Sequence, residues 1–152
     1  MKKLLGIAII LFSINSYAED IPILSSHIND RPNWKSDSAE LVYVGTRCGG
    51  VLDAVIWRFN DDKRPEIKKT KQMAKQMGDI FTFSTAALAE KTNFTSEGYA
   101  QKYKYWMNLY TSEAKDNLTK YNNIFEGLLG SDFKTCQQNI GVYKTLLSDL
   151  SK

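Results

Sequence analysis

The two cysteines of this 152-residue chain are the side chains whose chemistry the sequence constrains best. Cys48 and Cys136 lie 88 residues apart, and neither belongs to the C-x-x-C pattern of a redox site. Each cysteine follows the apolar spacing of a helix face, so we expect a structural disulfide between them. The chain-entropy model predicts that a disulfide closing such a loop stabilises the folded chain by about 4.5 kcal/mol. Gly49 and Gly50 directly follow Cys48, and we expect them to permit close packing between the first and last helices.

The aromatic residues form the densest cluster that could bind something. The segment YAQKYKYWMNLY has three tyrosines and a tryptophan on one helical face, while Tyr105 lies off that face and should be exposed. Tyrosine and tryptophan combine a large stiff ring with a polar tip, which suits binding surfaces and stacking on sugars. Core packing explains the same spacing. The residues assigned to this predicted binding surface are Tyr99, Lys102, Tyr103, Tyr105, Trp106 and Tyr110.

Acid–base and metal chemistry have few residues to use. His27 is the only histidine, and we expect it on the surface. The hydrolase, haem-attachment and dinucleotide motifs are absent, so we predict no catalytic residue, metal site or cofactor. Carboxylates leave one enzymatic alternative, a glycan-acting enzyme with Asp53 or Glu97. Asp53 lies in an apolar stretch, where we expect it to pair with Arg47 or Arg58 or to be solvated, with a raised pKa as the alternative.

The N-terminus indicates export. Two lysines precede an apolar run of 11 residues, and small residues at 16 and 18 fit a cleaved signal peptide over residues 1–18. The run is shorter than the roughly 20 residues that span a bilayer. Cleavage removes Lys2 and Lys3, so the net charge falls from +3 to +1, which argues against a nucleic-acid partner. We therefore predict a periplasmic or extracellular protein without membrane insertion after cleavage.

The remaining chain reads as an irregular leader over residues 19–35 and one helical-bundle domain over 36–152. Apolar residues recur at spacings of three and four, which predicts an all-α bundle of about four helices. We expect these helices over 37–59, 65–91, 95–128 and 131–150. Gly130 would stop the third helix and Ser131 would cap the last, and the polar stretch 111–117 leaves a break in the third helix open.

These observations favour a non-enzymatic protein that binds a protein or another envelope component. A structural or assembly subunit, including a homo-oligomer, is the second interpretation, and the carboxylate-dependent enzyme is the third. The sequence itself specifies no partner.

Overall fold

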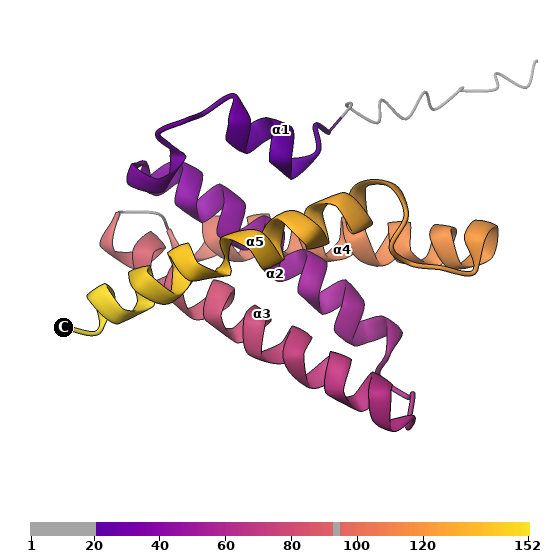
Figure 1. Ribbon diagram of the computed structural model, residues 1–152. Helices are drawn as coiled ribbons and strands as arrows, with labels where there is room; N and C mark the ends of the chain where they lie inside the picture. The colour runs from indigo at the N-terminus through magenta and orange to yellow at the C-terminus, as the bar shows by residue number, and fades with distance from the viewer. Residues whose placement is uncertain (1–20, 93–94) are drawn as a thin grey trace, which may run out of the picture.

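The computed structural model describes residues 21–92 and 95–152, so the predicted signal peptide lies outside the described residues. The described chain is all-helical, with four long helices and one disulfide, as predicted (Figure 1). Its elements in order are α1 (Leu24–Asn29), the 3-10 turn η1 (Trp34–Ser36), α2 (Ser38–Arg58), α3 (Pro65–Lys91), α4 (Ser96–Tyr121) and α5 (Gly127–Leu150). Within these residues, no helix is both long and apolar enough to cross a membrane.

Helix α2 is the central element. It packs against α3 and α4, while α5 packs on α3 and α2, and α1 packs on α5. Figure 1 shows α3 running back along α2, and α4 crossing behind this pair. The buried residues of α2 lie on all its sides, because it has neighbours on all of them.

The first three long helices begin where local residue chemistry places them. The Asp37 side chain caps α2 by accepting hydrogen bonds from the backbone N–H groups of Ala39 and Glu40. Pro65 occupies the first position of α3, where its missing N–H is no loss. The Thr95 hydroxyl accepts a hydrogen bond from the Gly98 N–H at the start of α4.

The end of α4 differs from the prediction. The helix is continuous through residues 111–117 and ends at Tyr121, and Asn122 then adopts a left-handed conformation with φ of 53°. Helix α5 begins at Gly127, so Gly130 is no stop and Ser131 is no cap. The loop is shaped by contacts from α4. The Asn117 amide donates to the carbonyls of Ile124 and Glu126.

The start of α5 receives its cap from another helix. A carboxylate oxygen of Glu113 on α4 accepts hydrogen bonds from the Leu128 and Leu129 N–H groups, at 2.7 and 3.2 Å. These N–H groups have no partner within the helix, and a carboxylate also suits the positive end of the helix dipole. The α4–α5 connection is therefore fixed by side chains of α4.

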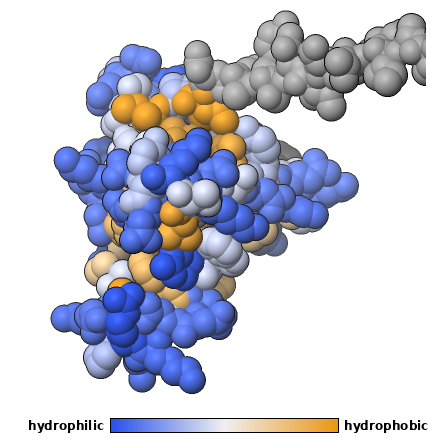
Figure 2. All heavy atoms as spheres, turned by 90° about the vertical axis from the view of Figure 1, so that its right-hand side faces the viewer, coloured by the Kyte–Doolittle hydropathy of each residue, from blue (hydrophilic) through white to orange (hydrophobic). Residues whose placement is uncertain are grey.

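The predicted irregular leader is partly ordered into α1 and η1. Leu24 is fully buried and Trp34 nearly so, and both belong to the hydrophobic core. The turn between them places Pro32 at its second position, and the Trp34 N–H donates to the Arg31 carbonyl. The leader is thus a strap, residues 21–37, that covers part of the bundle. On the face shown in Figure 2, hydrophobic residues gather at the top, near this strap, and most of the remainder is hydrophilic.

The two glycines after Cys48 pack against α4 instead of the predicted last helix. A Cβ on Gly50 would lie 2.7 Å from the Trp106 backbone carbon, and one on Gly49 would lie 2.5 Å from the Tyr103 ring. These distances are shorter than real Cβ contacts, so the α2–α4 crossing requires glycine at position 50, where the contact is with backbone, while a side chain at position 49 would displace the Tyr103 ring. The disulfide itself joins α2 to α5 as predicted, with 5.5 Å between the Cys48 and Cys136 Cα atoms.

Candidate functional site

A shallow pocket of about 320 Å³ lies on the surface where α2 and α4 meet. We call it the aromatic pocket; its lining residues are Tyr43, Gln101, Lys102, Tyr105 and Trp106. Tyr105 is 53% exposed at its rim, whereas Trp106 is only 6% exposed and forms part of the core. Three residues of the predicted binding surface therefore meet here, with Gln101 and Tyr43 as additions.

Three of the lining residues are aromatic, and Trp106 makes edge contacts with the other two, Tyr43 and Tyr105. The Tyr43 ring lies edge-on to Trp106, with 5.6 Å between centroids and 87° between planes. The Tyr105 ring meets Trp106 at 4.9 Å and 75°. Such T-shaped contacts are the geometry that aromatic quadrupoles favour, so the rings hold one another in place.

A buried arginine lies beneath these rings. The Arg47 guanidinium carbon is 4.8 Å from the centroid of the Trp106 ring and 5.9 Å from that of Tyr43. Arg47 also donates a 2.8 Å hydrogen bond to the Tyr43 hydroxyl. The pocket is therefore supported from the inside by a fixed cation.

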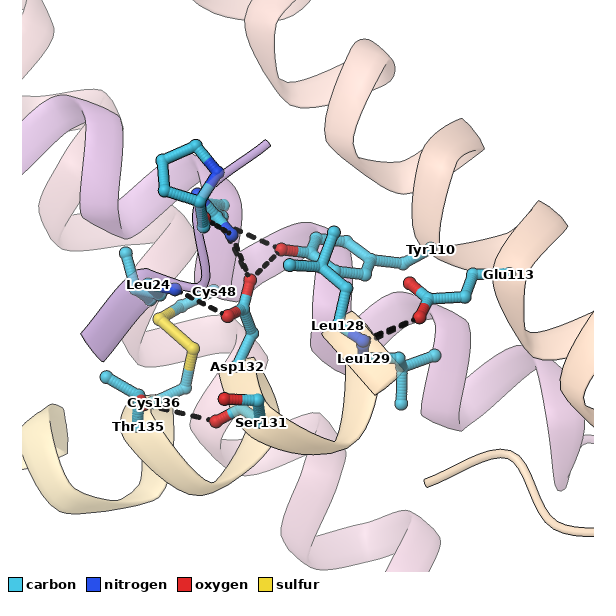
Figure 3. A network of polar contacts seen from close by, with 12 residues as sticks. Leu24, Cys48, Tyr110, Glu113, Leu128, Leu129, Ser131, Asp132, Thr135 and Cys136 are labelled. Atoms are coloured by element: carbon cyan, nitrogen blue, oxygen red, sulfur yellow. Dashed lines mark hydrogen bonds and ion pairs between the residues drawn. A yellow bond between two sulfur atoms is a disulfide. The ribbon is translucent and has the colours of Figure 1, made fainter. Parts of the chain in front are cut away.

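Arg47 forms a fully buried ion pair with Asp132 of α5. The two closest charged atoms, Arg47 Nη2 and Asp132 Oδ2, lie 2.6 Å apart, and neither side chain is exposed. The Tyr110 hydroxyl donates to Asp132 (Figure 3). It also accepts a 2.8 Å hydrogen bond from Arg47. Burial, and then the negative charge of Asp132, raise the pKa of Tyr110 far above its usual value, so this phenol remains a donor.

The same ion pair also holds the strap. Asp132 Oδ1 accepts a 2.7 Å hydrogen bond from the Leu24 N–H, as Figure 3 shows, and Arg47 donates one of 2.7 Å to the Pro22 carbonyl. This network was not predicted from the sequence, which suggested Asp53 as the partner of Arg47. Its members are distant in sequence, and the only local indication is Tyr43 one helical turn before Arg47.

His27 is buried, with 9% of its surface exposed, which corrects the prediction of a surface residue. Its Nε2 lies 2.6 Å from a carboxylate oxygen of Glu40, and Arg31 lies 3.3 Å from its Nδ1. The ring stacks on Tyr43 at 4.2 Å between centroids. His27 therefore links the strap to one wall of the aromatic pocket.

The other predicted binding residues belong to different places. Tyr110 lies in the buried network, and Tyr99 and Tyr103 pack between α3 and α4, near Asp53. The Tyr103 hydroxyl donates a 2.8 Å hydrogen bond to Asp53. Burial raises the pKa of Tyr99 to about 12, helped by the nearby Asp53 charge. The predicted single surface is thus divided among three environments.

Asp53 is the half-buried carboxylate that an enzyme would require, and its pKa is raised. Burial is the main cause, the hydrogen bond from Tyr103 opposes it, and the Asp79 charge adds to it. The Asp53 carboxylate accepts its hydrogen bond from Tyr103, and not from Arg47 or Arg58 as proposed from the sequence. Glu97, the other predicted carboxylate, is exposed at the start of α4.

Residues 21–92 and 95–152 contain no cluster of three or more histidine, cysteine, aspartate or glutamate residues that could hold a metal ion. Comparisons with protein-family models, curated proteins and solved structures returned no match to this chain.

Proposed function

We propose that this chain is an exported, non-enzymatic binding protein that recognises a component of the cell envelope through the aromatic pocket. The observation that carries the proposal is Tyr105, a large aromatic side chain 53% exposed at the rim of the pocket. Exposed aromatic side chains beside buried ones are typical of the residues that dominate binding energies.

The rigid support of the pocket favours recognition. Tyr43 is held by His27 on one face and by Arg47 at its hydroxyl, and Trp106 lies over the same guanidinium. A preformed site loses little conformational entropy when a ligand binds, which strengthens binding without adding contacts. The disulfide between α2 and α5 is compatible with export, because such bonds persist in oxidising compartments.

The test is sedimentation of the purified chain with an envelope fraction, comparing Tyr105→Ala with Tyr121→Ala. Both tyrosines lie on α4 and are similarly exposed, 53% and 60%, but only Tyr105 lines the pocket. We expect Tyr105→Ala to weaken binding by about tenfold or more and Tyr121→Ala to leave it unchanged. Equal binding by all three proteins would contradict the proposal.

A glycan-acting enzyme remains the alternative that one observation favours, the raised pKa of half-buried Asp53. A raised pKa suits a general acid. The purified chain would then release soluble fragments from cell-wall glycan, and Asp53→Asn would abolish the release. An assembly subunit would show itself differently, as an oligomer in native mass spectrometry.

A further inference from the structure

The orientation of the three aromatic rings bears on which ligand the pocket accepts. Rings set edge-on around a small volume form the cages that bind quaternary ammonium groups, because the ring faces attract positive charge. In this pocket a cation of the protein itself already lies against the rings. The Arg47 guanidinium is within 6 Å of both the Trp106 and the Tyr43 centroids.

Charge therefore disfavours a cationic ligand. Arg47 lies on the inner side of the Tyr43 and Trp106 rings and offsets part of their negative electrostatic potential. Lys102 adds a positive charge to the pocket lining. Asp132 compensates Arg47, but it lies fully buried on the inner side of the rings, with Arg47. The outward-facing groups of the pocket are ring surface and the Gln101 amide, whose Nε2 already donates a 3.2 Å hydrogen bond to Glu97.

Geometry also limits the class of ligand. A pocket of about 320 Å³ is at the small end of ligand sites, which suits one ring with its substituents. Gln101 to Trp106 lie in the interior of α4, so their backbone groups are used within the helix. A peptide backbone would find no such groups to pair with, whereas the hydroxyl and amide groups of a sugar need only side chains.

From these observations we propose that the aromatic pocket binds a neutral sugar ring, stacked through its C–H face on Tyr105, with the side-chain carbonyl oxygen of Gln101 accepting a hydrogen bond from one of its hydroxyls. This inference rests on the proposed function, because it names the ligand class of the same pocket. It excludes choline-like cations, because the Arg47 cation already lies against the rings. A proline-rich peptide docks on aromatic side chains without pairing its backbone, so it is the competing ligand that the titration distinguishes.

The test is a titration of the isotope-labelled full-length mature chain, followed by nuclear magnetic resonance. The probes are a trimer of N-acetylglucosamine, choline chloride and a proline-rich decapeptide, and the signals followed are the Trp106 indole N–H and the amides of residues 101–106. We expect the sugar to shift these signals and choline to leave them unchanged. Tyr105→Ala should weaken sugar binding by about tenfold or more, since it removes an anchoring ring, while Tyr105→Phe should retain it. Tyr121→Ala is the matched control.

Several outcomes would overturn the inference. If choline or the decapeptide shifts the pocket signals and the sugar does not, the pocket binds another class of ligand. If the sugar shifts only signals from other helices, the sugar site lies elsewhere. If no probe binds while envelope binding still depends on Tyr105, the sugar assignment is wrong and the proposed function stands. If envelope binding is also independent of Tyr105, both are wrong.

Discussion

Arg47 and Asp132 show how one residue pair can join four segments of a small protein. Arg47 bonds to Pro22 in the strap, Tyr43 on its own helix and Tyr110 on α4, besides its ion pair with Asp132 on α5. Buried ion pairs add little net stability, since desolvation offsets the attraction. In this protein the ion pair instead holds the four segments in fixed relative positions, because the N–H donors of Arg47 bond to each of them.

Removing one partner of this pair should be strongly destabilising. Asp132→Ala leaves an unpaired buried guanidinium, and we expect the free energy of unfolding to fall by about 3–5 kcal/mol. The double variant Arg47→Met with Asp132→Leu should recover part of this loss, since neither charge remains, while the Leu24 N–H, the Pro22 carbonyl and the Tyr110 hydroxyl lose their partners in the pair. Urea denaturation of the wild type and both variants measures this. A double variant no more stable than Asp132→Ala would show that the shape of the pair matters more than its charge.

The raised pKa of Asp53 predicts the direction of a pH effect. The folded chain holds this proton more tightly than the unfolded chain, so Asp53 contributes stability below its ordinary pKa of 3.8, and this is lost as pH rises through the folded value. Asp53→Asn keeps an oxygen acceptor for Tyr103 but carries no charge. The variant should gain stability relative to the wild type as pH rises from about 3.5 to 7.

Urea unfolding at several pH values tests this, with Asp116→Asn on the exposed side of α4 as the control. A stability difference between Asp53→Asn and the wild type that does not change with pH would contradict the assignment.

At the scale of elements, the α2–α4 crossing depends on glycine. Gly50→Ala would place a methyl group 2.7 Å from the α4 backbone, which cannot move as a side chain can. We expect a net destabilisation of about 1–3 kcal/mol from overpacking, although alanine favours helices. Gly141→Ala on α5 is the matched substitution, because nothing lies within 4 Å of the added Cβ. It should raise stability by about 0.5–1 kcal/mol.

Thermal unfolding followed by circular dichroism compares the two variants. Equal effects at Gly50 and Gly141 would mean that helix propensity, and not the crossing, determines the outcome.

The starts of α2, α3 and α4 were predictable from sequence because they depend on neighbouring residues. Asp37, Pro65 and Thr95 act within one turn of their own helices. The end of α4 was not predictable in this way, because Asn117 and Glu113 shape the loop and cap α5 through tertiary hydrogen bonds. Apolar periodicity continues through this region and carries no information about where the chain turns.

The candidate site was half predictable for a similar reason. The exposure of Tyr105 followed from its place on the helix, and Trp106 belonged to the buried stripe. Tyr43 and Arg47 could not be assigned to the pocket, because they reach it from another helix. A close packing of helices was expected at Gly49 and Gly50, but their type alone does not say which helix they face.

For the whole molecule, the disulfide is the principal covalent constraint. The bond between Cys48 and Cys136 closes a loop of 88 residues, so replacing both cysteines by alanine removes a large restriction on the unfolded chain. We expect a loss of about 2–5 kcal/mol in the free energy of unfolding with the helical content retained. Far-ultraviolet circular dichroism during urea unfolding measures both quantities. Unchanged stability would show that the non-covalent contacts between α2 and α5 already restrict the chain as much.

The docking of the strap has a consequence for synthesis. Leu24 bonds to Asp132, 108 residues later, and the Tyr143 hydroxyl bonds to the Leu41 carbonyl, 102 residues earlier. The ribosome makes the strap first and α5 last. The contacts of the strap with α2 can form early, but its hydrogen bond to Asp132 must wait until almost the whole chain has been translated.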